Sequence, residues 1–190
     1  YKVNPGDGAF YGPKLDFHVK DSLGRVWQCG TIQLDMNLPE RFDLTYVDHH
    51  GEKQRPIMLH RVIFGSIERF IGILIEHFAG AFPLWLAPVQ VKVLPVKNEF
   101  HLAYAKEVVA KLEAAGIRVE LDDREEKLGY RIREAQMQKV LYQLVLGENE
   151  VANGTVTYRE YGKQAQNTLE FDAFVAKLLE EINEKKRVGE

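Results

Sequence analysis

Residues 67–75 combine an almost wholly apolar helical pattern with Glu68 and Arg69, two charged side chains that could contact a ligand. A helix that is apolar on every side is normally buried in a protein core or a membrane. This run is shorter than the ~20 residues that a membrane span needs, so the sequence predicts a core helix. A guanidinium stays protonated, and burying it without a partner is costly. We therefore expect Arg69 to meet an anion, either an acid of the protein or a ligand in a pocket.

A glycine-rich segment, residues 6–14, leads into the first predicted strand and places Tyr11 close to Lys14. Its glycines would let the backbone approach a ligand closely, while the two side chains offer a hydroxyl and a cation. The segment lacks the GK[ST] ending and the following helix of a Walker phosphate loop. The residues alone favour an ordinary loop over a ligand-binding one.

The strand predicted at residues 27–35 carries polar side chains at alternate positions, which are Cys29, Thr31, Gln33 and Asp35. Gln28 falls on the opposite side unless the register shifts. Gly30 inside a strand often marks a bulge, and a bulge would bring Gln28 and Thr31 to one surface. Such a surface suits either solvent or a pocket for an adenine or an amino acid, and the sequence leaves both readings open.

His60 follows a predicted strand, and a lone histidine is most often structural. A catalytic zinc takes three protein ligands, and the sequence has no HExxH or CxxC pattern. Any metal on His60 would therefore need ligands from elsewhere. Residues 48–50, Asp-His-His, are interpreted as an exposed turn, and Cys29 as a packed thiol.

Composition places broad limits on partners and compartment. The chain has 190 residues, a net charge of −3 and one cysteine. This charge gives no global attraction to nucleic acid, so any RNA contact would need a local patch. A single cysteine excludes an internal disulfide and fits a reducing compartment. No signal peptide, lipidation motif or membrane span is visible. The chain opens without Met, and we expect it to be a fragment.

The sequence pattern changes near residues 85 and 86, which predicts domains over 1–85 and 86–190. In the first domain, strands at 14–19 and 25–35 form an antiparallel hairpin around a turn at 21–24. We predict a second hairpin between residues 45–47 and 56–60. An antiparallel sheet with one late helix packed on it is therefore expected.

The second domain alternates strands with helices. Strands are predicted at 89–96, 117–121, 142–146 and 155–160, and helices at 102–112, 129–139 and 171–182. Such alternation implies right-handed crossovers and a mixed, mainly parallel sheet covered by helices. The predicted fold class is α/β (α+β).

Segments from both domains match one family in chain order. They are Gly8–Lys14, Gln28–Asp35, Pro39–Phe42, His60–Arg61, Gly65–Leu74, Trp85–Gln90 and Glu126–Glu134. Together they resemble threonyl-tRNA synthetases, and residues 65–74 resemble motif 3 of class II synthetases. The resemblance implies the end of the antiparallel class II catalytic sheet with its motif 3 helix, followed by an anticodon-binding domain.

The resemblance also implies a catalytic site. Arg69 would contact ATP, bound with Mg2+, while Lys14 and Tyr11 would lie near threonine and the activation chemistry. Residues matching positions that line the adenylate site are Gln28, Thr31, Gln33 and Ser66. His60 matches one of three Zn2+ ligands, whose partners lie outside this chain. A site that requires the threonine hydroxyl can reject valine by about 10⁴-fold.

Anticodon contacts are implied for Arg124, Glu150 and Arg159. Glu125 stands where the family commonly has an asparagine, and an ionised carboxylate cannot donate a hydrogen bond to a base. Five basic and five acidic residues lie between positions 122 and 139, so this region is locally balanced in charge. Arginines that stack on splayed bases need no large net charge.

The function implied by the resemblance is threonine–tRNA ligation: ATP-dependent activation of threonine and its transfer to the 3' end of tRNA(Thr). The intact protein is expected to be a cytoplasmic homodimer with no membrane or DNA partner. Class II motifs 1 and 2 are missing, so we expect the isolated chain to be inactive. A non-catalytic tRNA-binding or regulatory relative is the alternative, and a two-domain interaction protein is a third hypothesis. The site residues retained together, Tyr11, Lys14, His60, Ser66 and Arg69, favour the enzyme.

Overall fold

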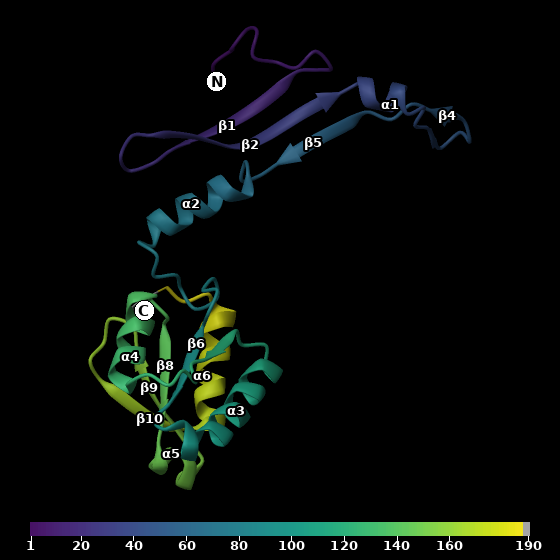
Figure 1. The fold of residues 1–190 in the computed structure, drawn as a ribbon. Coiled ribbons are helices and arrows are strands. Elements are labelled where there is room, and N and C mark those ends of the chain that lie inside the picture. The colour runs from purple at the N-terminus through teal and green to yellow at the C-terminus, as the bar shows by residue number, and fades with distance from the viewer. Residues whose placement is uncertain (188–190) are drawn as a thin grey trace. The chain divides into compact units, whose positions relative to one another are not determined.

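The computed structural model describes residues 1–187, which form two compact units (Figure 1). The first unit spans Tyr1–Leu74 and the second begins at Ile75. The division falls within helix α2 (Ile67–His77), ahead of the change in sequence pattern near residues 85 and 86. In the described part of the chain, no helix is long and apolar enough to cross a membrane.

The first unit is built on a three-stranded antiparallel sheet in the order β1-β2-β5. Its strands are β1 (Lys14–Lys20), β2 (Val26–Asp35) and β5 (Met58–Val62). The predicted hairpin between the first two strands is confirmed. Asp21 closes their turn, since its Oδ1 accepts hydrogen bonds from the backbone N–H groups of Leu23 (2.9 Å) and Arg25 (2.8 Å).

The predicted second hairpin is wrong in its pairing. Strand β3 (Tyr46–Val47) pairs with β4 (Lys53–Gln54), whereas β5 pairs with β2. Pro56 lies between β4 and β5, and a proline has no N–H to extend a ladder of hydrogen bonds. A short helix that the sequence analysis did not predict, α1 (Asn37–Arg41), follows β2.

A β-bulge in the first hairpin decides which side chains share a face. Phe17 pairs with Gly30 and His18 with Gln28, so Cys29 is the extra residue of β2. Residues paired across strands point to the same side of a sheet. The register therefore places one set of side chains, here named the polar face, together: Lys14, Asp16, Gln28, Thr31, Gln33 and His60. The bulge predicted at Gly30 is confirmed.

Helix α2 forms as predicted, but its predicted burial is wrong. None of its residues is buried, and Ile67 is 72% exposed. Its best covered side chains, Phe70, Ile73 and Leu74, follow helical spacing along one stripe. Glu68 and Arg69 are exposed, so water can solvate both charges and neither requires a buried counter-ion.

The second unit is a mixed five-stranded sheet in the order β10-β9-β8-β6-β7. Strands β7 and β8 are parallel to β6, while β9 and β10 complete an antiparallel edge. The strands are β6 (Val91–Pro95), β7 (Val119–Leu121), β8 (Tyr142–Leu146), β9 (Thr155–Glu160) and β10 (Gln166–Glu170). The helices are α3 (Asn98–Ala114), α4 (Leu128–Met137), α5 (Glu148–Asn153) and α6 (Phe171–Glu184). The sequence analysis did not predict α5 and β10.

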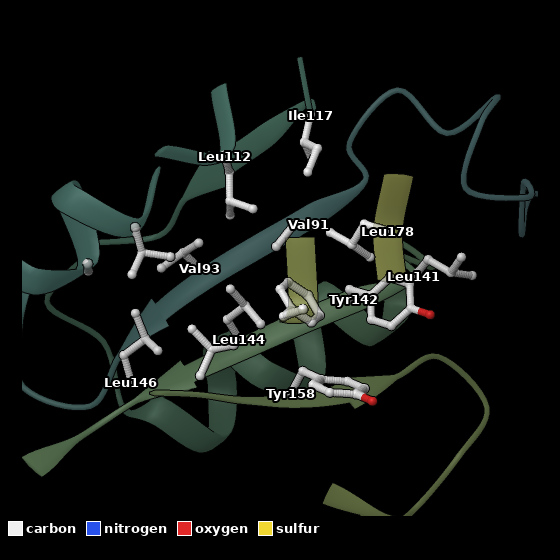
Figure 2. Packing of buried hydrophobic residues seen from close by; sticks show 14 of the residues in the cluster. Val91, Val93, Leu112, Ile117, Leu141, Tyr142, Leu144, Leu146, Tyr158 and Leu178 are labelled. Atoms are coloured by element: carbon white, nitrogen blue, oxygen red, sulfur yellow. The ribbon is translucent and has the colours of Figure 1, made fainter. Parts of the chain in front are cut away.

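The hydrophobic core lies on one face of this sheet, beneath α3 and α6. Alternate residues of β6 and β8 point into it, and Val91, Val93 and Leu144 are fully buried (Figure 2). Phe174 and Leu178 close the core from α6. Figure 1 shows α4 on the other side of the sheet. There the buried Arg131 donates hydrogen bonds to the backbone oxygens of Pro95 (2.7 Å) and Asp122 (2.6 Å).

We expect Phe174→Ala to destabilise the second unit by about 3–5 kcal/mol, because it would leave a cavity beneath α6. Phe174 is fully buried, whereas Phe100 is 58% exposed on α3. Phe100→Ala is the matched control and should cost less than about 1 kcal/mol. Chemical denaturation followed by circular dichroism measures both changes, and similar losses would contradict the assigned core.

Candidate functional site

Asp16 lies at the centre of the polar face. Its Oδ1 accepts hydrogen bonds from Gln28 Nε2 (2.8 Å) and Thr31 Oγ1 (2.8 Å), and its Oδ2 lies 3.0 Å from Lys14 Nζ. Partial burial raises the pKa of Asp16, but the hydrogen bonds from Lys14, Thr31 and Gln28 outweigh it and lower this pKa overall. The bond to Asp16 raises the pKa of Lys14. The two groups therefore form a charged pair at neutral pH.

Sequence reasoning missed Asp16. The signal was present, because Lys14 and Asp16 occupy alternate positions of one strand and so share a face. The register adds what the pattern lacked: Asp16 pairs directly with Thr31 across the sheet.

The glycine-rich segment packs against the end of β2. Backbone N–H groups of Leu34 and Met36 donate hydrogen bonds to the carbonyls of Pro13 and Tyr11, both at 3.1 Å. A Cβ atom at Gly12 would overlap the carbonyl oxygen of Leu34, so only glycine permits this approach. Tyr11 is thereby held beside the polar face.

The position of Tyr11 links this segment to the polar face. Its hydroxyl donates a hydrogen bond to Gln33 Oε1 at 3.4 Å. Gln33 in turn pairs with Lys14 on one side and with His60 on the other. Three predicted site residues therefore lie in one row across the sheet, with Tyr11 over it.

His60 is held by a buried carboxylate. His60 Nε2 lies 2.8 Å from Asp35 Oδ2, and the Asp35 residue is only 2% exposed. The other Asp35 oxygen accepts hydrogen bonds from the backbone N–H groups of Asn37 (2.9 Å) and Leu38 (3.0 Å). The bond to His60 is the main reason that the pKa of Asp35 is lowered.

This arrangement suits a metal-binding histidine. Such histidines commonly use one ring nitrogen for the metal and the other for a carboxylate. Asp35 engages Nε2, which leaves Nδ1 on a side chain that is 43% exposed. Within residues 1–187, however, no group of three His, Cys, Asp or Glu side chains is arranged to hold a metal. Asp35 is a second residue that the sequence analysis did not assign to the site.

The start of α2 meets β2 beside Gln28. Ser66 Oγ accepts a hydrogen bond from the backbone N–H of Arg69 (3.2 Å) and so caps the helix. Arg69 Nη1 donates to the backbone oxygen of Gln28 at 3.4 Å. Gly65 has φ +72°, and its Cβ position lies 3.1 Å from the same oxygen. Arg69 makes no ion pair with an acid among the described residues, so its charge remains available to an anion.

In the second unit, Arg124 is engaged by two acids. Its Nε and Nη2 donate to the two oxygens of Asp122 at 2.8 and 2.7 Å, and Nη2 also lies 2.5 Å from Glu134 Oε2. The bond from Arg124 is the main reason that the pKa of the buried Asp122 is lowered. Glu125, the next residue, is exposed.

Glu150 and Arg159 have different surroundings. Glu150 accepts hydrogen bonds from the backbone N–H of Gly147 (2.8 Å) and from Thr157 Oγ1 (2.6 Å), which fixes the start of α5. Arg159 pairs with Gln166 of β10, and its guanidinium faces the side-chain amide of Gln166.

The structure brings two of these predicted RNA-contacting positions to the same edge. Arg124 follows parallel strand β7, and Glu150 follows parallel strand β8. The carboxyl ends of parallel strands meet at one edge of a sheet, where ligands commonly bind. Arg159 instead lies opposite Gln143, near the start of β8, and does not join them at that edge.

Two family models match successive parts of the chain. The first, the tRNA synthetase class II core domain (G, H, P, S and T), matches residues 2–78. The second, the anticodon binding domain, matches residues 90–181.

Individual relatives agree with these matches. The threonine–tRNA ligase of Fusobacterium nucleatum is 62% identical over 186 residues, which cover 97% of this chain and 30% of that protein. That of Clostridioides difficile is 58% identical over 188 residues, covering 99% of this chain and 29% of that protein. The crystal structure of the RNA binding domain of threonyl-tRNA synthetase from Cryptosporidium parvum Iowa II gives a TM-score of 0.78 at 42% identity. It covers 95% of this chain and 46% of that one.

The chain thus spans about 30% of the length of the curated relatives that it matches. The sequence resemblance, both family models and the mixed α/β architecture agree with one another. The chain belongs to the threonyl-tRNA synthetase family, and it carries a part of the class II core domain followed by an anticodon-binding domain.

Proposed function

We propose that this chain supplies one part of the active site and the anticodon-binding domain of a threonine–tRNA ligase. The observation that carries the proposal is the polar face, where Lys14, Gln28, Thr31, Gln33 and His60 lie together beside the start of α2. The proposed substrates are threonine, ATP and tRNA(Thr), and the proposed compartment is the cytoplasm.

Activation of threonine needs no nucleophile from the protein. The threonine carboxylate attacks the α-phosphate of ATP, and pyrophosphate leaves. The protein contributes positioning and fixed positive charge, which stabilise the negative charge of the transition state. Arg69 and Lys14 are the cations that can serve here, with Mg2+ carried by the ATP phosphates. Tyr11 and Gln33 extend the same face and are placed to orient threonine.

The geometry of His60 suits one ligand of a Zn2+ whose other ligands lie outside these residues. Such a zinc would supply a Lewis acid for the amino and hydroxyl groups of threonine. Asp35 holds Nε2 of His60, which fixes the direction of the other ring nitrogen, Nδ1.

The second unit is proposed to bind the anticodon. Arg124 and Glu150 lie at one edge of the sheet, and Arg159 on β9 would make a separate contact away from that edge. We propose that the functional boundary falls at residues 85 and 86, between the two matched domains, and that the complete ligase is a homodimer. A tRNA-binding or regulatory relative without the reaction is the second candidate, and the exposed acid Glu125 favours it.

Threonine-dependent ATP–pyrophosphate exchange by the full-length ligase containing this sequence tests the proposal. We expect exchange in the wild type and a fall of roughly 10²- to 10³-fold in kcat/KM with Arg69→Ala, because transition-state charge loses a partner. Affinity for tRNA should stay nearly unchanged, since the proposed anticodon contacts lie on the second domain.

Arg61→Ala is the matched control, because Arg61 pairs with Ile32 and so projects from the opposite face of the sheet. A zinc-loaded wild type without exchange would reject the ligase and leave the non-catalytic relative. Equal loss of exchange and tRNA binding in Arg69→Ala would contradict the proposal that the first domain activates threonine and the second binds the anticodon.

The zinc assignment predicts that His60→Ala lowers the metal bound by the full-length ligase by about tenfold or more. Elemental analysis of purified protein measures this directly. His49→Ala is the control, because His49 lies in the exposed turn between β3 and β4. Equal zinc in wild type and His60→Ala would remove His60 from the metal site.

Replacing Glu125 with Asn should tighten binding of a transcript that carries a threonine anticodon by about fivefold, since one hydrogen bond contributes ~1 kcal/mol. The amide adds a donor and removes a negative charge near phosphate. Glu126→Asn makes the same chemical change at the neighbouring exposed position and should have less effect. Filter binding with matched and altered anticodons distinguishes base recognition from general charge, and unchanged affinity would show that position 125 does not act.

A further inference from the structure

We propose that Asp16 is the positioning residue of the nucleotide-binding face, and that it fixes Gln28 as a hydrogen-bond acceptor for ATP. The inference rests on the proposed function and deepens it. Asp16 lies at the junction of three residues already assigned to the face, which are Lys14, Gln28 and Thr31.

The hydrogen-bond directions around Asp16 follow from its charge. An ionised carboxylate only accepts hydrogen bonds. Thr31 must therefore direct its hydroxyl hydrogen toward Asp16 Oδ1, and Gln28 must turn its amino group, Nε2, toward the same oxygen. The Thr31 oxygen then accepts a second bond from Gln28 Nε2 at 3.2 Å. The three hydrogen bonds that join Asp16, Thr31 and Gln28 in a triangle therefore have only one possible assignment of donors and acceptors.

The orientation of the Gln28 amide has a chemical consequence. With Nε2 held by Asp16 and Thr31, the amide oxygen Oε1 points away from the carboxylate. Among the described residues no donor bonds to this oxygen, so Gln28 presents an acceptor to a ligand. A group that binds it must donate a hydrogen bond. ATP offers such groups on its ribose hydroxyls and on the exocyclic amine of adenine.

Asp16 also holds a cation in place. Lys14 Nζ lies 3.0 Å from Asp16 Oδ2, and the Lys14 side chain is 23% exposed. The ammonium is therefore anchored beside the acceptor while part of it stays open to an anion. The Asp16 carboxylate would thus position both the Gln28 oxygen that accepts a hydrogen bond from ATP and the Lys14 ammonium that contacts a phosphate.

The test is Asp16→Asn in the full-length ligase, assayed by threonine-dependent ATP–pyrophosphate exchange. The asparagine amide can turn a donor toward Lys14 or Gln28, so the triangle loses its direction. We expect kcat/KM for ATP to fall roughly 10- to 100-fold, the range for hydrogen bonds to a charged group. Asp21→Asn is the matched control, because Asp21 also accepts several hydrogen bonds but lies in the turn beyond the polar face. It should stay within about twofold of wild type.

Nucleotide analogues distinguish positioning from a structural defect. The wild type should discriminate against at least one of 2'-deoxy-ATP, 3'-deoxy-ATP and N6,N6-dimethyl-ATP, and the analogue concerned identifies the donor. That discrimination should shrink in Asp16→Asn and in Gln28→Ala, because the acceptor is misdirected or missing. Thr31→Val supplies a second variant with Asp16 intact, and it should weaken the same discrimination.

The outcomes separate the two proposals. An active wild type whose analogue profile is unchanged in Asp16→Asn and Thr31→Val overturns the positioning role. The same conclusion follows if Asp21→Asn loses as much activity as Asp16→Asn. A zinc-loaded wild type without exchange overturns the proposed function instead. Thermal unfolding of each variant confirms that the proteins compared are folded.

Discussion

The arrangement of the first unit depends on one carboxylate shared by a cation, an amide and a hydroxyl. A charge that is partly withdrawn from water must be paired and hydrogen-bonded, and Asp16 meets this requirement with Lys14, Gln28 and Thr31. These partners come from both strands of the hairpin. Because all three side chains bond to Asp16, the loss of any one of them changes the surroundings of the others.

The two units differ in how they bury apolar side chains. The buried hydrophobic cluster lies in the second unit, between the sheet, α3 and α6. In the first unit, the face opposite the polar face carries Leu15 and Leu59, which are 65% and 62% exposed. The same contrast explains the error over α2. Its sequence correctly indicates a helix suited to burial, but burial also needs a covering surface, and the first unit supplies none within its described residues.

Much of the second unit can be predicted from local pattern, because β6 and β8 are short, mainly apolar runs and the long helices α3 and α6 have regular apolar stripes. The short elements α5 and β10 carry weaker signals. Helix α5 depends on capping by Glu150, and β10 is mostly polar and becomes a strand by pairing with β9. In the first unit, pattern could locate β5 but could not select β2 as its partner, since pairing depends on contacts distant in sequence.

Prediction of the site shows the same division between residue type and geometry. The motifs identified Lys14, Gln28 and His60, and Gly30 correctly indicated the bulge. Asp16 and Asp35 went unassigned because their roles depend on distances to residues on other strands. Burial was the reason to expect an anion beside Arg69, and the resemblance to motif 3 implied that this anion belongs to ATP. The structure offers a different physical reason, which is an exposed guanidinium anchored to Gln28 at the edge of the face.

The bulge at Cys29 also limits how this hairpin can change. Before the bulge the even-numbered residues of β2 point to the polar face, and after it the odd-numbered residues do. A regular strand of the same length would pair Cys29 with His18 and turn Gln28 to the far side of the sheet, away from Asp16. The position of the amide thus depends on the bulge, and a change that removed the bulge without shortening the strand would move Gln28 off the polar face.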